Sequence, residues 1–178
     1  MIQPKNQPAP LIELLPVTRE QAPILANLLE LYMHDFSEFV PLNLEDDGHF
    51  GYPPLPLYWS DPDRHPFLLR VDRNLAGFAL VKRGSEISGD HTVWDMAEFF
   101  VLRGHRRRGL GTLAAHEVFK HFPGSWEVRV MPANVPATLF WQRTISSFTG
   151  STIQPADVER NRKSWQLFSF ESPQSFSP

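Results

Sequence analysis

A basic, glycine-containing turn is the part of the sequence best suited to bind an anion. It reads R-R-R-G-L-G-T over residues 106–112 and follows an apolar stretch that ends near Val101. Glycines in the first turn of a helix leave backbone N–H groups uncovered, and such groups bind phosphate. The spacing is neither that of a P-loop nor the dinucleotide pattern GxGxxG. The turn therefore predicts a pyrophosphate site of another kind, with a solvated basic loop or a nucleic-acid patch as alternatives.

Glu98 is the second residue that could do chemistry, because it interrupts the apolar stretch before the basic turn. Strand alternation would place it on one face with Trp94, Met96 and Phe100. Burial among such side chains raises the pKa of a carboxyl group, which suits a general base for an amine nucleophile. The alternative is a structural carboxylate paired with a nearby arginine.

The elements that must position these residues follow from hydrophobic periodicity and turn residues. Strands are predicted at 11–17, 66–71, 75–82, 93–101, 126–130 and 164–170, and helices at 19–36, 109–122 and 133–145. A long proline-rich segment, 37–66, is predicted to be a functional loop with short helical turns. The order β-α-β-β-β-α-β-α-β indicates a mixed α/β domain on one central sheet.

Two motifs resemble the GNAT N-acetyltransferase superfamily. Residues 106–111 are similar to its acyl-CoA signature, R/Q-x-x-G-x-G/A. After the predicted strand at 126–130, the segment M-P-A-N-V-P-A-T-L-F-W resembles the family's N-x-x-A-x-x-hydrophobic-aromatic motif through Asn134, Ala137, Phe140 and Trp141. The order of elements also matches from residue 11 to residue 170. The resemblance therefore covers nearly the whole chain.

The resemblance implies a GNAT-like fold, in which a mostly antiparallel sheet splays at one parallel pair, here 93–101 and 126–130, and is flanked by helices. CoA would enter the splay, with backbone groups of 99–101 along its pantetheine arm and N–H groups of 107–112 on its pyrophosphate. The cofactor-binding residues implied are Phe99, Phe100, Val101, Arg106, Arg107, Arg108, Gly109, Leu110, Gly111, Thr112, Asn134 and Trp141.

The resemblance also implies where the acceptor binds and what Glu98 does. In the family, the end of the first helix and the long loop wall the acceptor pocket, which here points to Tyr32, Asp35, Tyr52 and Tyr58. Packing is the alternative for each aromatic, and the acids of this region would suit a cationic amine. Several family members resemble this chain in placing Glu on the strand of Glu98, in keeping with a base.

Trp141 departs from the family pattern, in which this position is often a tyrosine that protonates the departing thiolate. An indole N–H is far too weak an acid for that step. A thiol has a pKa of about 8.5, so a thiolate is a tolerable leaving group without such help.

Length, composition and charge exclude several classes of protein. With 178 residues, 42% hydrophobic and 21% charged, it fits one globular domain. We expect that domain over 11–170, between flexible tails at 1–10 and 171–178.

There is no Cys, and the seven His lack metal-ligand spacing, so no metal site is expected. A net charge of −3 disfavours nucleic-acid binding. No apolar run could span a membrane or serve as a secretory signal, which predicts a cytoplasmic protein without a membrane partner.

Together these features predict an N-acetyltransferase that moves an acetyl group from acetyl-CoA to a primary amine. Attack would be direct, within a ternary complex and without a covalent enzyme intermediate, which is consistent with the absence of Cys. The amine could belong to a small molecule or a peptide, and a homodimer is common in the family. Two alternatives remain: an acyl-CoA-binding regulatory module of the same fold with little catalysis, suggested by Trp141, and a nucleic-acid-binding protein that uses the basic turn.

Overall fold

The computed structural model describes residues 10–173. Most of the two predicted tails, 1–10 and 171–178, lies outside these residues. The last strand continues to Ser172, two residues beyond the predicted end of the domain. No helix in the described part is long and apolar enough to cross a bilayer.

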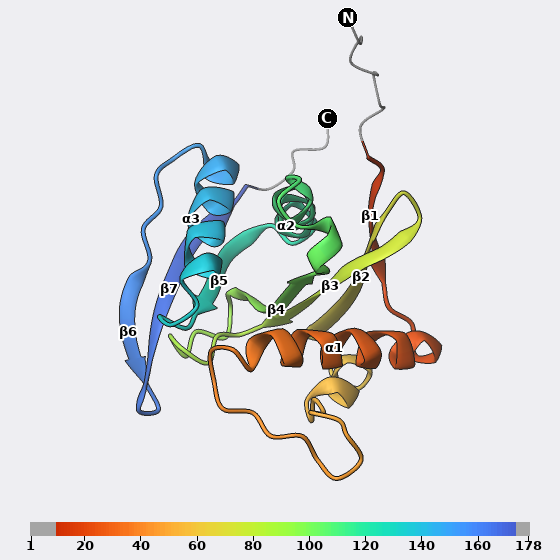
Figure 1. The fold of residues 1–178 in the computed structure, drawn as a ribbon. Coiled ribbons are helices and arrows are strands. Elements are labelled where there is room, and N and C mark those ends of the chain that lie inside the picture. The colour runs from red at the N-terminus through yellow and green to blue at the C-terminus, as the bar shows by residue number, and fades with distance from the viewer. Residues whose placement is uncertain (1–9, 174–178) are drawn as a thin grey trace, which may run out of the picture.

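One seven-stranded sheet organises the described chain (Figure 1). Its strands are β1 (Ile12–Pro16), β2 (Arg64–Val71), β3 (Asn74–Arg83), β4 (Trp94–Val101), β5 (Gly124–Val130), β6 (Ala156–Arg160) and β7 (Lys163–Ser172), in the order β1-β2-β3-β4-β5-β7-β6. The helices are α1 (Ala22–Phe36), α2 (Leu110–His121) and α3 (Val135–Thr149), with 3-10 turns η1 (Arg19–Gln21), η2 (Leu55–Trp59) and η3 (Arg103–His105). The mixed α/β class is confirmed.

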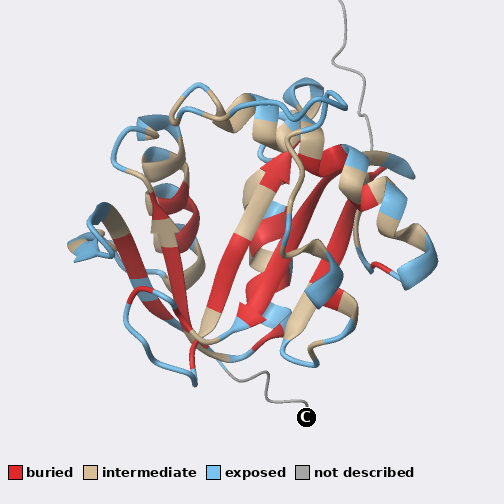
Figure 2. Cartoon of the chain, turned by 90° about the horizontal axis from the view of Figure 1, so that it is seen from below, coloured by how far each residue is buried: buried red, intermediate tan, exposed pale blue. Residues whose placement is uncertain are grey.

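Alternation along the central strands fills two apolar cores, one on each face of the sheet. On β3, Phe78 and Leu80 pack towards α1 and η2, whereas Ala79 and Val81 pack towards α2 and α3. Since both faces are covered, the central strands are almost continuously apolar and mostly buried (Figure 2).

β4 and β5 form the sheet's parallel pair, and they diverge soon after they meet. Only two residues of each strand pair, Trp94 with Trp126 and Asp95 with Glu127. Beyond Asp95 the facing edges of β4 and β5 no longer pair with each other. The predicted splay is therefore present, and α1, the long loop and α3 lie around it (Figure 1).

β6 is the strand that the sequence pattern missed. Its five residues, A-D-V-E-R, are mostly exposed and carry a single sizeable apolar side chain, Val158. It lies at the edge of the sheet and pairs only with β7, through a tight turn at Asn161 and Arg162, both in the left-handed region. An exposed edge strand needs no hydrophobic face, so no alternation marks it.

Candidate active site

Two cavities meet where β4 and β5 part. The larger, of about 1130 Å³, runs past the basic turn and contains Arg103, Arg106, Arg107 and Arg143; we call it the arginine cavity. The smaller, of about 520 Å³, contains Glu98 and is called the glutamate cavity. Both are lined by Tyr32, Phe36, Phe99, Asn134, Ala137 and Trp141. A molecule in one cavity can therefore reach a molecule in the other past Phe99.

Gly109 shapes the basic turn at the start of α2. Its φ of +76° lies in the left-handed region, and a Cβ there would have no described heavy atom within 4 Å apart from those of Gly109 and its two chain neighbours. The first N–H groups of α2 have no acceptor within the helix. Gly111 serves another purpose, because its Cβ would lie 3.2 Å from Phe140 Cε2 and 3.5 Å from Val101 Cγ2. Gly111 therefore lets α3 and β4 approach α2.

Asp35 connects α1 to the basic turn. Its carboxylate accepts hydrogen bonds from Arg103 Nη2 (2.7 Å) and Arg106 Nη2 (2.6 Å), and Arg106 Nε also donates to the carbonyl of Val101 (2.6 Å). Partial burial raises the pKa of Asp35, but the two guanidinium groups lower it more, so its net pKa lies below the ordinary value. Asp35 is thus already matched by two cations. Arg103 was missed because it precedes the recognisable motif.

The other residues proposed for the cofactor divide into two sets. Phe99, Phe100, Val101, Arg107 and Thr112 line the arginine cavity. Arg108 does not line it, and Leu110 is 1% exposed in the core beneath it, so only the backbone of Leu110 could take part.

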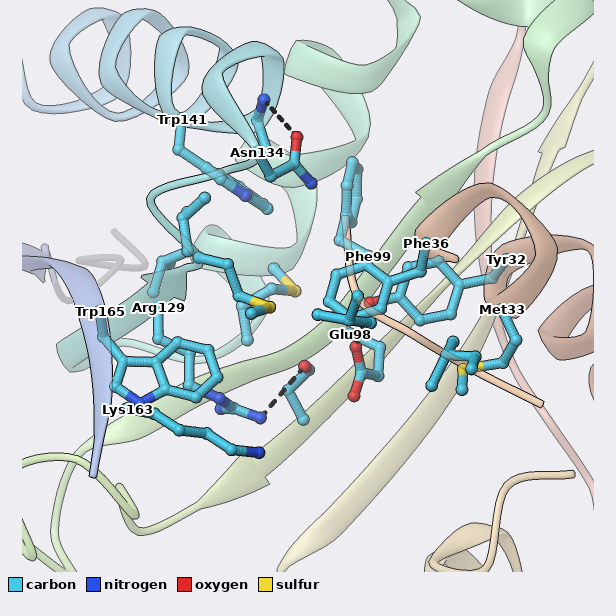
Figure 3. A pocket seen from close by; sticks show the side chains of 18 of the residues that line it. Tyr32, Met33, Phe36, Glu98, Phe99, Arg129, Asn134, Trp141, Lys163 and Trp165 are labelled. Atoms are coloured by element: carbon cyan, nitrogen blue, oxygen red, sulfur yellow. Dashed lines mark hydrogen bonds between the residues drawn. The ribbon is translucent and has the colours of Figure 1, made fainter. Parts of the chain in front are cut away.

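Asn134 and Trp141 bring α3 to the junction of the cavities. Asn134 Oδ1 accepts from the N–H of Ala137 (3.1 Å) and caps α3, while the rest of its amide faces the junction (Figure 3). Trp141 is buried, and its ring lies 5.2 Å from that of Phe99 and 4.9 Å from that of Phe140. These contacts make Trp141 a rigid wall of both cavities.

A β-bulge places Glu98, and it corrects the face expected from alternation. Leu80 pairs with Glu98 but Val81 pairs with Met96, which leaves Ala97 as an extra residue in β4. Met96 and Trp94 consequently pack with α2 and α3, whereas Ala97 and Phe100 pack towards α1. Glu98 turns towards α1 as well. The expectation that it shares a face with Trp94 and Met96 is wrong. Of the three residues expected on its face, only Phe100 lies with it on the α1 side.

Both carboxylate oxygens of Glu98 accept a hydrogen bond from a tyrosine. Tyr32 Oη donates to Oε2 (2.5 Å), and Tyr52 Oη donates to Oε1 (3.0 Å). Burial raises the pKa of Glu98 above its ordinary value, against the opposing effects of Arg129 and of the two tyrosines. Burial and the nearby carboxylate also raise the pKa of both phenols. The two hydrogen bonds thus fix the carboxylate of Glu98, while the raised pKa values keep both phenols protonated.

Tyr52 reaches Glu98 because α1 anchors the long loop. Glu30 accepts from the backbone N–H of Phe50 (2.7 Å) and from that of Gly51 (2.9 Å). Tyr58 lies elsewhere: it is 3% exposed, lines neither cavity, and its hydroxyl has no hydrogen-bond partner among the described residues. Its predicted contact with the acceptor finds no support in this placement.

The far wall of the glutamate cavity comes from β5 and β7. Arg129, Lys163 and Trp165 line it (Figure 3), and Arg129 Nη1 donates to the buried carboxylate of Asp95 (2.6 Å). The sequence analysis missed these three residues because nothing in the chain pattern shows which β7 residues lie beside β5. Within residues 10–173, no group of His, Asp or Glu is placed to hold a metal ion.

The arginine cavity fits a ligand such as CoA. It combines the start of α2 at Gly109, the side chain of Arg107, which has no ion pair with a described residue, and the edge of β4 that leaves its parallel partner. Its lining includes both the basic turn and Phe99, which also lines the glutamate cavity.

Comparison with known proteins agrees with this geometry. The family model described as "Acetyltransferase (GNAT) family" matches residues 25–145. A solved acetyltransferase from Thermus thermophilus is 21% identical, with a TM-score of 0.66, covering 90% of this chain and 96% of that one. Arabidopsis thaliana NAA60 with a bisubstrate analogue is 19% identical, with a TM-score of 0.58 and coverage of 90% and 98%.

Spermidine N-acetyltransferase from Vibrio cholerae, solved with CoA and spermine, is 12% identical, with a TM-score of 0.62 and coverage of 90% and 95%. A comparison with curated proteins gives no significant match. At these identities the solved structures show a shared fold, while the family model covers more than half of the chain. On that match, the chain belongs to the GNAT family of acetyltransferases.

Proposed function

We propose that this protein transfers an acetyl group from acetyl-CoA to a primary amine by direct attack in a ternary complex. The observation that carries the proposal is the meeting of the two cavities beside Phe99, with the basic turn in one and Glu98 in the other. The similar structure of NAA60 holds a bisubstrate analogue, and that of spermidine N-acetyltransferase holds CoA and spermine, which supports a two-substrate reaction on this fold.

The chain's residues bind and orient the two substrates. N–H groups at the start of α2, with Arg107, hold the pyrophosphate of CoA, and the free edge of β4 at residues 99–101 lies along the pantetheine arm. Acetyl-CoA supplies an acyl group already activated as a thioester. Trp141 and Phe99 exclude water from the place where the acyl group meets the amine.

Glu98 accepts the proton that the amine loses, directly or through a water molecule. Burial raises its pKa, which makes the ionised carboxylate a stronger base, and its hydrogen bonds to Tyr32 and Tyr52 fix the carboxylate. The two phenols are poor proton donors, because burial raises the pKa of each. The thiolate of CoA therefore leaves unaided, and its proton comes from solvent.

A panel of amines tests the proposal. The purified protein is incubated with acetyl-CoA and each amine, free thiol is measured, and the product is checked by mass spectrometry for an added acetyl group. CoA binding is measured separately by calorimetry. We expect CoA binding and at least one acetylated amine. CoA binding without turnover on any amine would instead support a regulatory acyl-CoA-binding module, and no CoA binding would contradict both.

A further inference from the structure

We propose that the acceptor carries an anionic group, a carboxylate or a phosphate, besides its amine, and that Lys163 with Arg129 binds this group in the glutamate cavity. The proposal rests on the proposed function and names the substrate class for the same site. It also changes the expectation drawn from the acids near α1, which pointed to a cationic acceptor.

The charges that line the glutamate cavity carry this inference. They are one acid, Glu98, and two bases, Arg129 and Lys163. Arg129 is largely matched by Asp95 behind it. Lys163 forms no ion pair with any described residue, and its side chain extends along the same wall as Arg129 (Figure 3). Lys163 is exposed and lines the cavity, so it adds a positive charge there that no described acid pairs with.

Charges around the cavity are of both signs. Glu86, which acts on Arg129, is paired with Lys82. Arg160 and Arg162 are exposed on the β6–β7 hairpin beside Lys163, without an ion pair in the described structure, so that hairpin has three bases against two acids, Asp157 and Glu159. The acids of the long loop, Glu45, Asp46 and Asp47, do not line the cavity, and Asp35 is held by two arginines. The surplus of bases on the hairpin attracts an anion and disfavours a polycation.

The other residues that line the cavity indicate the chemistry of the acceptor between its two polar ends. They are mainly apolar and include Met33, Phe36, Val40, Leu42, Met96 and Trp165. A cavity of about 520 Å³ suits a small molecule. Glu98 would receive the amine and Lys163 the anion, with an apolar body between them. The chemistry is that of an amino acid or an aminophosphonate rather than a polyamine.

Matched pairs of acceptors test the charge requirement directly. Phenethylamine is compared with phenylalanine, its methyl ester and its aminophosphonate analogue, and hexylamine with aminohexanoate. Spermidine represents a polycation. We expect the acceptor that carries an anionic group to exceed its partner without one in kcat/KM by about 10-fold or more in at least one set. The carboxylate and phosphonate arms show which anion is preferred. Equal or better turnover of the amines without an anionic group and of spermidine would overturn the proposal.

Variants of Lys163 locate the effect. Lys163→Met keeps the apolar stem and removes the charge, Lys163→Glu reverses it, and Lys120→Glu makes the same reversal on the exposed face of α2. We expect Lys163→Glu to lower kcat/KM about 10- to 100-fold for the preferred acid, mainly through KM, and to leave or raise kcat/KM for its partner without the anionic group. Lys120→Glu should change neither. A Lys163→Glu enzyme with wild-type discrimination would contradict the proposal.

Binding separates this inference from the proposed function. Calorimetry of the preferred acid, or of phenylalanine and aminohexanoate if nothing is acetylated, is done on the protein–CoA complex. Binding that Lys163→Glu weakens, without turnover of any amine, would uphold the anion site and overturn the transferase. Turnover of amines without discrimination would overturn only the anion site. Neither binding nor turnover would overturn both.

Discussion

The phenol of Tyr32 donates to Glu98 Oε2 at 2.5 Å and thereby joins α1 to the bulge in β4 across 66 residues of sequence. Tyr52 makes the equivalent bond to Oε1 from the long loop. The two bonds give the carboxylate one orientation in the glutamate cavity. They also oppose the rise in pKa that burial causes.

Removing one of these phenols should move the pH dependence of catalysis. A hydrogen bond to the ionised carboxylate lowers its pKa, so Tyr52→Phe raises the pKa of Glu98 further. Because Glu98 works as a base only when ionised, we expect the acid limb of the kcat/KM profile to shift to higher pH. Tyr32→Phe should shift it in the same direction.

Tyr58→Phe is the matched control for these two variants. It removes a phenol that lines neither cavity and has no hydrogen-bond partner among the described residues. We expect an unchanged profile and a folded protein. A shift in Tyr58→Phe as large as that in Tyr52→Phe would mean that the profile does not report on the bonds to Glu98.

Glu30 should act on the reaction through Tyr52, as a positioning residue. Glu30→Ala removes the acceptor of two backbone N–H groups of the long loop and should cost about 1–3 kcal/mol of stability. It should also shift the acid limb as Tyr52→Phe does, while Glu30→Gln, with one acceptor oxygen left, shifts it less. The shifts of Glu30→Ala and Tyr52→Phe should not add in the double variant. Additive shifts, or a stability loss without any shift, would refute the link.

Gly109 and Gly150 offer a matched test of the basic turn. Both have left-handed φ, +76° and +71°, and neither would bring a Cβ within 4 Å of another described atom. Gly109→Ala and Gly150→Ala should therefore lose about 1 kcal/mol of stability each. Only Gly109→Ala should weaken CoA binding in calorimetry, since Gly150 ends α3 away from the arginine cavity. Equal CoA affinities in the two variants would contradict the assignment of the turn.

Trp141 should matter for packing more than for proton transfer. Trp141→Phe keeps a ring against Phe99 and should change the rate of acetyl transfer little, whereas Trp141→Ala should destabilise the protein by about 3–5 kcal/mol. Single-turnover rates and thermal melts measure the two effects. If Trp141→Phe binds CoA but loses turnover, the unaided departure of the thiolate is wrong.

Much of the fold follows from local patterns. The amphipathic spacing of α1 and α2 and the apolar runs of β2 to β5 are visible because each packs a defined face on the sheet. β6 was missed since an exposed edge strand carries no such pattern. The splay between β4 and β5 came from the resemblance of two motifs, and periodicity could not have located it.

Less of the site was predictable, because it depends on irregular backbone and on distant partners. The bulge at Ala97 places Glu98 on the opposite face of the sheet from Met96, and no residue type at that position predicts a bulge. Arg103 and Glu30 act through contacts with chain segments that are distant in sequence. Lys163 lies at the cavity because β7 pairs with β5, and the sequence pattern does not specify that pairing. Chemistry-bearing residues could be named, but their partners required the structure.

The most direct test of the account is the single-turnover rate of acetyl transfer by Glu98→Gln, measured with the best amine across pH. Gln keeps the size of the side chain but cannot accept a proton. We predict a rate about 10²–10⁴-fold below wild type at neutral pH, CoA affinity close to wild type, and a smaller loss at high pH, where more of the amine is already unprotonated. A Glu98→Gln enzyme that transfers acetyl at the wild-type rate per folded molecule, with only its melting temperature lowered, would show that Glu98 is structural and contradict the account.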